Sequence, residues 1–272
     1  MTTTSTSIPR RAIKLGSRLI DSVRPPARGI TVLIYHRVGA RGGGQMNLDP
    51  AVFEDHVAWL AGNRRVIDLD DAVAEITGPG PVEPGVVLTF DDGTADWVDV
   101  IAPILTRHRT PATFYLTTGY PEGEHPLPDG ETAITWAGVS DLTSTGLATI
   151  GSHTHSHLLL DRLDPAGIAT ELDRSIDLIG ERTGAAPKHF AYPKAVDPST
   201  KAADAVRVRF ASASLAGTRA NAAGDNPLRL FRSPVQAADS FGDFRRKVDG
   251  GMGLEDALRR RINRIRYRGA SR

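Results

Sequence analysis

The stretch Val86-Val87-Leu88-Thr89-Phe90-Asp91-Asp92-Gly93 decides the fold. A short run that is apolar on both faces is typical of a strand buried in a parallel sheet. Neighbouring strand residues point to opposite faces, but a bend at the strand end would bring Asp91 and Asp92 into one mouth. A buried carboxylate pair calls for a metal ion or a shared proton. The alternative is that the Asp-Gly end only caps the following helix.

A second polar cluster, Gly151-Ser152-His153-Thr154-His155-Ser156-His157, places three of the eight histidines within five residues, again at a strand end. His153 and His157 lie four residues apart, so one helical turn or a compact loop would present both imidazoles to one ion. Two imidazoles and one carboxylate form an open site for a divalent ion. A chance cluster on a solvated loop is the alternative. We expect His155 to lie behind the site or to face outward.

Outward from these motifs, short β-type runs alternate with helical ones, as in βα units. Strands are expected over residues 30–36, 86–91, 112–117, 149–153, 189–193, 208–214 and 229–235. Helices are expected over residues 50–63, 70–76, 96–107, 164–184 and 254–267. Seven strands with intervening helices suit an open doubly wound sheet or a closed barrel. In both, sites form at the carboxyl ends of the strands, where the two motifs lie.

Composition narrows the chemistry. The 272 residues contain no cysteine, which excludes disulfides, thiolate metal sites and a Cys nucleophile. Any metal must therefore be held by His, Asp or Glu. The sequence also contains no P-loop and no Gly-x-Ser-x-Gly nucleophile elbow.

The net charge of +1 hides an acidic body between basic ends. Residues 1–28 carry +5 and residues 259–272 carry +7, which leaves −11 for the rest. Residues 8–23 have apolar residues at near-helical spacing with cations between them. This end is either a solvated arm or a helix packed on its own domain, or else it lies on an anionic membrane surface. The acidic body argues against nucleic acid as a partner.

No stretch is long enough to span a bilayer, and the N-terminus lacks the apolar core of a signal peptide. We therefore expect a cytoplasmic enzyme, with peripheral contact to the inner membrane face as a further expectation. The expected organisation is a basic amphipathic arm over residues 1–28, one catalytic domain over 29–250 and a basic helix or tail over 251–272. The oligomeric state is not readable from the sequence.

Thr89-Phe90-Asp91-Asp92-Gly93 followed by His153-Thr154-x-x-His157 resembles the first two motifs of the polysaccharide deacetylases, the NodB-homology group or carbohydrate esterase family 4. The resemblance runs from about Val32 to Val235. The Tyr35-His36 opening and the stretch Phe190-Ala191-Tyr192-Pro193 are similar to the branch that includes poly-N-acetylglucosamine deacetylases. The resemblance implies a distorted (β/α)7 barrel fold. It also implies an enzyme that removes acetyl groups from an N-acetylated sugar or polysaccharide.

The resemblance also implies roles for individual residues. Asp91 would be the general base, and Asp92 would bind the metal together with His153 and His157. Metal-bound water would attack the acetamide carbonyl. The metal is expected to be Zn²⁺, with Co²⁺, Ni²⁺ or Mn²⁺ as alternatives. In the Pro193–Lys194 turn, the Lys194 N–H would stabilise the oxyanion, because proline has no N–H.

Two departures from the family pattern matter. The third-motif Arg is missing from Ala191-Tyr192-Pro193-Lys194-Ala195, and Arg232 is the expected replacement. The family's late histidine is also absent, because no histidine follows His189. In the branch with a Tyr-His opening the early histidine looks like the general acid, so the resemblance implies that role for His36.

Tyr192 and Trp97 are candidate substrate contacts, with core packing as the alternative for Trp97. The departures also motivate another hypothesis, a catalytically silent member that only binds carbohydrate.

Overall fold

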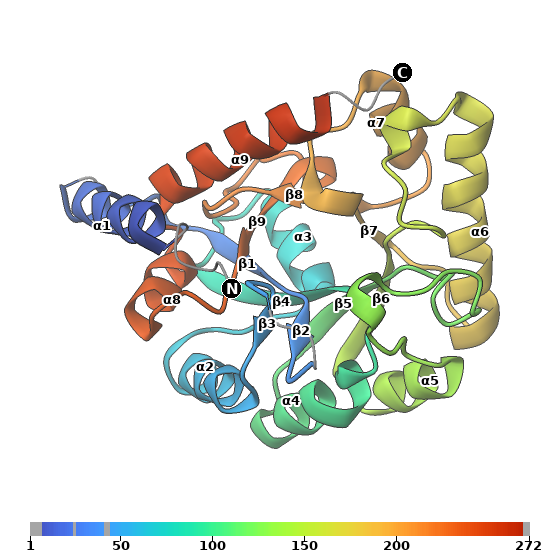
Figure 1. Cartoon of the computed structure of the whole chain (residues 1–272), viewed down its shortest axis with the longest axis horizontal. Coiled ribbons are helices and arrows are strands. Elements are labelled where there is room, and N and C mark those ends of the chain that lie inside the picture. Colours follow the sequence, from blue (N-terminus) through green and yellow to red (C-terminus); the bar gives the residue numbers. More distant parts are fainter. Residues whose placement is uncertain (1–6, 24–25, 41–43, 269–272) are drawn as a thin grey trace, which may run out of the picture.

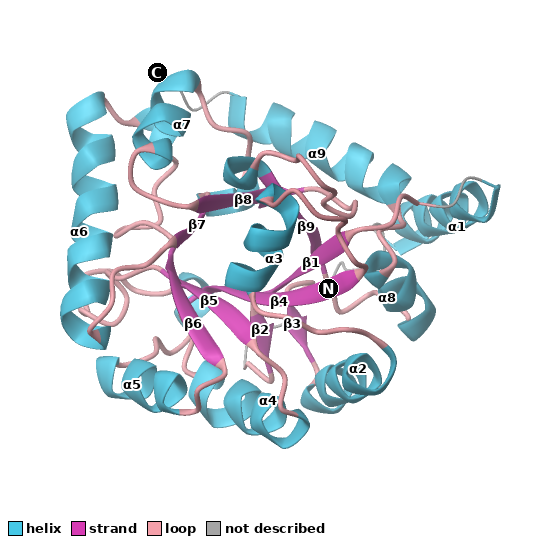
Figure 2. Ribbon diagram, turned by 180° about the vertical axis from the view of Figure 1, so that it is seen from behind, coloured by secondary structure: helices cyan, strands magenta, loops and turns pink. Residues whose placement is uncertain are grey.

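Seven parallel strands close into a barrel in the computed structural model, which describes residues 7–23, 26–40 and 44–268 (Figure 1, Figure 2). In order around the barrel they are β1 (Ile30–Tyr35), β4 (Gly85–Asp92), β5 (Ala112–Leu116), β6 (Ala148–Ser152), β7 (His189–Ala191), β8 (Ser212–Ala216) and β9 (Leu230–Pro234). Strand β1 pairs with both β4 and β9 and so closes the ring. The predicted seven-stranded barrel is confirmed, and the open sheet is excluded.

The strands form where the sequence is apolar on both faces. All residues of β1 and the first seven of β4 are buried, because helices cover the outside of the barrel and side chains fill its interior. Strand β8 begins four residues later than predicted. The preceding residues 200–207 form a helix that the sequence analysis did not predict, and Val208 at the end of that helix is 68% exposed.

Helices surround the barrel, and one of them, α3, lies across an open end of it (Figure 2). They are α2 (Pro50–Asn63), α3 (Leu69–Thr77), α4 (Ala102–His108), α5 (Trp136–Ser144), α6 (Pro165–Thr183), α7 (Thr200–Arg207) and α8 (Phe241–Val248). Short helical turns lie at Trp97–Ile101, Pro128–Gly130, Leu160–Arg162, Pro193–Ala195 and Pro227–Arg229. The sequence signal at Asp164-Pro165 is confirmed, since the Asp164 carboxylate accepts from the Gly167 N–H at 2.7 Å and caps α6.

A two-stranded sheet of β2 (Arg37–Val38) and β3 (Asn47–Leu48) lies outside the barrel. The two ends of the chain form helices α1 (Ser7–Val23) and α9 (Gly253–Arg268), which pack against each other, and α1 also contacts α8. Of the alternatives for the N-terminal segment, the structure shows a helix packed on its own domain. The structure does not describe the side chains of several basic residues at the two ends of the chain. These are Arg10, Arg11, Arg24 and the arginines after Asn263. Within the described part of the chain, no helix is long and apolar enough to cross a bilayer.

Candidate active site

Asp91 and Asp92 are the last residues of β4, and both line one pocket of about 610 Å³. Asp92 has φ of 85°, an uncommon conformation for a residue other than glycine. The expected bend at the strand end is therefore found at Asp92 itself. It lets two sequential carboxylates share a single mouth, where alternation along a straight strand would separate them.

Asp92 lies against the imidazoles of His153 and His157. Its Oδ1 is 3.7 Å from Nε2 of His153 and 3.4 Å from Nε2 of His157. The carbonyl of Ala191 is 2.7 Å from Nδ1 of His153. A carbonyl only accepts, so Nδ1 carries the hydrogen and Nε2 keeps a free lone pair. A tetrahedral ion with ligands at about 2.0–2.1 Å would separate its ligand atoms by about 3.3 Å. The three side chains therefore fit a divalent cation.

The histidines sit on a compact loop rather than on a helical turn. Thr154 and His157 have φ of 67° and 57°, and the Thr154 hydroxyl accepts from the His157 N–H at 3.0 Å. Buried Glu171 of α6 accepts from the N–H groups of His155 and Ser156 at 3.1 and 2.8 Å. Glu171 fixes the loop that carries both imidazoles. Sequence reasoning missed it, because its partners lie fifteen residues or more away along the chain.

Burial and neighbouring groups keep Asp92 and His157 in their metal-binding protonation states. Burial alone would raise the pKa of Asp92, but the nearby imidazoles of His36, His157 and His153 bring it to about 2. Burial, together with the neighbouring His153, lowers the pKa of His157 to about 3. At neutral pH the carboxylate is therefore ionised and the His157 imidazole neutral, as metal ligation requires.

Asp91 is held by Arg232 of β9, a strand that only β1 separates from β4 around the barrel. The guanidinium donates to the two carboxylate oxygens at 2.7 and 2.9 Å and to the Thr89 hydroxyl at 3.0 Å. Arg232 is fully buried, and its guanidinium lies 4.9 Å from the centre of the Tyr115 ring. Burial would raise the pKa of Asp91, but the charge of Arg232 holds it below its usual value. Asp91 is therefore an ionised proton acceptor.

Gly151 makes room for this arrangement. A Cβ at Gly151 would lie 2.6 Å from Cδ1 of Tyr115, closer than real Cβ atoms approach. The tyrosine hydroxyl lies 3.1 Å from that of Ser214, which fixes the ring beneath Arg232. Gly151 therefore leaves space for the Tyr115 ring, which packs against the arginine that holds Asp91.

His36 and Lys194 line the same pocket as the two carboxylates. Burial lowers the pKa of His36, so its imidazole is neutral at neutral pH. Among the described residues, its buried Nδ1 has no hydrogen-bond partner. Lys194 has φ of 59°, so the chain turns sharply where it faces the pocket.

Three other sequence-predicted residues lie elsewhere. Trp97 is fully buried with its ring 5.0 Å from that of Phe114, so the prediction that it stacks on a sugar is wrong. Tyr192 is also buried, edge-on against Phe190 at 5.0 Å, and packs in the core instead of facing the mouth. Pro193 is buried beside Lys194 and contributes only the turn. The sequence places these residues after strand ends, but this position alone does not determine the direction in which their rings point.

A second group of three potential ligands, Glu124, His125 and His155, gathers outside the pocket. His155 lies 2.9 Å from the Thr118 hydroxyl and 3.1 Å from the Glu124 carboxylate, and His125 lies 3.1 Å from the Ser156 hydroxyl. These imidazoles already share hydrogen bonds with protein groups. As expected, His155 therefore lies behind the metal-ligand loop.

Sequence reasoning missed one wall of the pocket. Ile13 of α1 and Leu258, Arg259, Ile262 and Asn263 of α9 line the same cavity as the carboxylates and imidazoles. No spacing pattern links these distant segments to the motifs. Only the packing of the two terminal helices brings them to the site.

Comparison with known proteins shows what the part of the chain that carries this site is similar to. The family model for polysaccharide deacetylases matches residues 79–211. The Bacillus subtilis (strain 168) protein YxkH, provisionally named a polysaccharide deacetylase, is 25% identical over 224 residues, which are 80% of this chain and 76% of YxkH.

Two solved structures share the fold. IcaB from Ammonifex degensii superposes with a TM-score of 0.70 at 20% identity, covering 82% of this chain and 97% of IcaB. The Streptococcus pyogenes deacetylase PplD, solved with acetate, also gives 0.70, at 19% identity over 82% of this chain and 99% of PplD. These two likenesses show a shared fold. The family model spans both motifs at the mouth of the seven-stranded barrel, so over residues 79–211 the chain is similar to the polysaccharide deacetylases.

Proposed function

We propose that the protein is a divalent-metal-dependent hydrolase that removes N-acetyl groups from an N-acetylated sugar or polysaccharide. One observation carries the proposal: an arginine-paired carboxylate, Asp91, shares a pocket with the Asp92, His153 and His157 ligand set. The similarity of residues 79–211 to the polysaccharide deacetylases supports carbohydrate deacetylation as the reaction class.

The proposed ligands are Asp92, His153 and His157, and their nitrogen and oxygen donors suit Zn²⁺, with Co²⁺, Ni²⁺ or Mn²⁺ also acceptable. A bound divalent ion supplies a water of lowered pKa and a positive charge for the developing oxyanion. The Lys194 N–H, on the turn that faces the pocket, is the proposed second donor to that oxyanion.

Asp91 is the proposed general base. It accepts a proton from the attacking water as the new C–O bond forms, and Arg232 keeps it ionised beforehand. The C–N bond then breaks and the departing amine takes up a proton. We assign that transfer to His36. Because burial keeps its imidazole neutral, it would receive the proton from the Asp91 side during the reaction instead of holding it in advance.

The silent-member hypothesis rested partly on the missing third-motif arginine. The contact between Arg232 and Asp91 supports catalysis instead, because the charge arrives from another strand. An intact base has no purpose in a module that only binds sugar.

The test is acetate release from N-acetylglucosamine oligomers by chelator-treated protein, before and after each divalent metal is added back. We expect release only with metal. Asp92→Ala should lose both metal and activity, whereas Asp91→Asn should keep the metal and lose activity. Sugar binding with no acetate release in metal-replete protein would favour the silent member instead.

We also propose peripheral contact with an anionic membrane surface. On α1, Leu15, Leu19 and Val23 are exposed at four-residue intervals and so form one stripe. The chain is basic at both ends, and basic residues are attracted to anionic lipid headgroups. An anionic bilayer would therefore accept both the cations and the exposed aliphatic stripe.

A further inference from the structure

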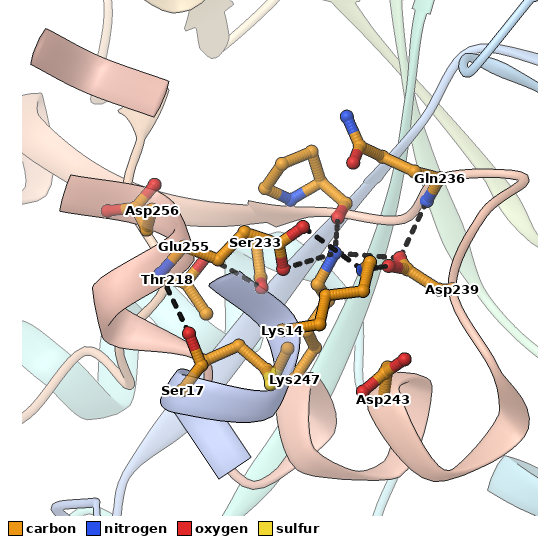
Figure 3. Close-up of polar contacts among 12 residues, drawn as sticks. Lys14, Ser17, Thr218, Ser233, Gln236, Asp239, Asp243, Lys247, Glu255 and Asp256 are labelled. Carbon is orange, nitrogen blue, oxygen red and sulfur yellow. Dashed lines mark hydrogen bonds and ion pairs between the residues drawn. The ribbon is translucent and has the colours of Figure 1, made fainter. Parts of the chain in front are cut away.

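The wall formed by α1 and α9, here called the terminal wall, is a built part of the pocket. Lys14 of α1 is buried between Asp239 and Glu255, and its ammonium lies 3.0 Å from the Glu255 carboxylate (Figure 3). Lys247 of α8 pairs with the same Asp239 at 2.7 Å. The Ser17 hydroxyl accepts from the Glu255 N–H at 2.9 Å. This network fixes both helices relative to the barrel.

The two helices approach closely as well. A Cβ at Gly16 would lie 3.4 Å from Cδ2 of Leu254, so the small residue lets α9 lie against α1. The Asp21 carboxylate accepts from the Met252 N–H at 2.8 Å, immediately before α9 begins. The terminal wall is therefore anchored at several points along its length, and its pocket-facing side chains have fixed positions.

Three of the six pocket-facing residues of α1 and α9 are aliphatic, and the other three are Glu255, Arg259 and Asn263. Leu258 and Ile262 lie one helical turn apart on α9, and together with Ile13 they line the cavity that holds the carboxylates and imidazoles. Leu258 is 37% exposed and Ile262 is 55% exposed. Leu254, one turn earlier, is exposed too, so the stripe runs from the cavity toward solvent. Exposed aliphatic residues grouped beside a catalytic cavity mark a site for an apolar ligand group.

We propose that the substrate is an amphiphile, an N-acetylated sugar joined to a lipid chain, and that the terminal wall binds the first part of that chain. This inference rests on the proposed function. The sugar acetamide would lie at the carboxylates and imidazoles, while the chain leaves the cavity along Leu258 and Ile262. These aliphatic side chains offer the hydroxyl groups of a polysaccharide no hydrogen-bond partner, whereas a lipid chain is apolar along its whole length.

The experiment compares two substrates that share the sugar and differ in the group attached to it. They are the methyl and octyl β-glycosides of N-acetylglucosamine, with the octyl compound kept below its critical micelle concentration. Each buried methylene improves binding by about fourfold. We therefore expect kcat/KM to be at least about tenfold higher for the octyl glycoside.

The Leu258→Ser/Ile262→Ser variant should lose most of this preference, measured as the ratio of kcat/KM for the two glycosides within that variant. Val52→Ser/Val208→Ser is the matched control, since both valines are exposed and lie outside the cavity. Unchanged melting temperatures would show that both variants fold. Equal kcat/KM for the two glycosides in the wild type, or an equal loss on both in the Leu258 variant, would overturn the inference.

A calorimetric titration of both glycosides separates this inference from the proposed function. If neither glycoside is deacetylated, the proposed function fails. The inference that the terminal wall binds a lipid chain is still supported if the octyl glycoside binds at least about tenfold more tightly than the methyl glycoside. That difference must also depend on Leu258 and Ile262. Equal affinities for the two compounds would overturn the inference. If both are hydrolysed without preference, the proposed function stands and the inference about the lipid chain is wrong.

Discussion

Asp91 and Arg232 are both almost inaccessible to water, so removing one partner leaves the other as an uncompensated buried charge. We expect Arg232→Gln to lower the free energy of unfolding by about 3–5 kcal/mol. Urea denaturation at pH 7, monitored by circular dichroism, would measure the loss. Activity should fall as well, because the pKa of Asp91 would rise and the base would be partly protonated.

A second variant tests whether this loss comes from the unpaired charge. Arg232→Gln/Asp91→Asn removes both charges, so it should be more stable than Arg232→Gln alone, although equally inactive. If the double variant were the less stable of the two, the destabilisation would come from lost packing against Tyr115 and not from electrostatics.

The metal-ligand residues give a prediction about ligand-linked stability. An ion that binds only the folded state adds about 2.7 kcal/mol when its concentration is a hundred times its dissociation constant. We expect Zn²⁺ to raise the melting temperature of chelator-treated protein. His157→Ala should abolish most of that increase. His125→Ala should keep it, because His125 belongs to the hydrogen-bonded group outside the pocket. An equal loss in both variants would mean that the ion binds elsewhere.

At the scale of elements, α1 is tied to α8 through an ion pair that can be titrated. Arg18 donates to the two oxygens of Asp243 at 2.8 Å each. Burial would raise the pKa of Asp243, but this contact and the Ser240 hydrogen bonds lower it to about 2. An unfolded aspartate has a pKa of about 3.9. The contribution to stability is therefore full above that pH and is lost as the pH falls toward 2.

We expect Arg18→Gln to lower the free energy of unfolding by about 1–2 kcal/mol at pH 7, since Arg18 is partly exposed. The difference from the wild type should stay constant down to about pH 5 and shrink at pH 3. Arg207→Gln is the control, because its pair with Asp204 is exposed on both sides and should contribute little. A wild-type advantage that grows in acid would contradict the assigned pKa of Asp243.

The elements that the sequence predicted well are those whose burial follows from local pattern. Strands such as β4 are apolar on both faces, and α6 carries its own cap at Asp164, so short windows suffice. Helix α5 and the start of β8 were missed because short segments with weak periodicity take their structure from tertiary packing. The metal-ligand residues were predictable because they follow strand ends. The orientation of Trp97 was not, since either face of its helical turn was open to it.

At the scale of the whole molecule, the ends of the chain and the catalytic pocket are parts of one structure. Sequence arithmetic places positive charge at both ends and negative charge between them. In the fold, α1 and α9 lie together along one side of the barrel (Figure 1) and border the pocket. A surface that attracts the two terminal helices would therefore be brought close to the pocket. This places a lipid-bearing substrate and a membrane surface beside the same wall.

The corresponding prediction concerns vesicle binding by the full chain. We expect the protein to sediment with vesicles of phosphatidylglycerol and phosphatidylcholine, and much less with phosphatidylcholine alone. Binding should fall at high salt, because charges more than a Debye length apart are then screened. Leu15→Ser/Leu19→Ser/Val23→Ser should reduce partitioning by about tenfold or more, since three exposed aliphatic side chains no longer enter the interface.

The test uses point substitutions because deleting α1 would also remove Lys14. Asp239 and Glu255 would then lose that ion-pair partner. Val208→Ser, on a distant exposed helix end, should bind vesicles as the wild type does. Equal sedimentation of the triple variant and the wild type would mean that the α1 stripe does not touch the bilayer. Salt-sensitive binding that survives the triple variant would assign the attraction to the basic residues alone. The aliphatic stripe of α9 would then serve the substrate and not the membrane.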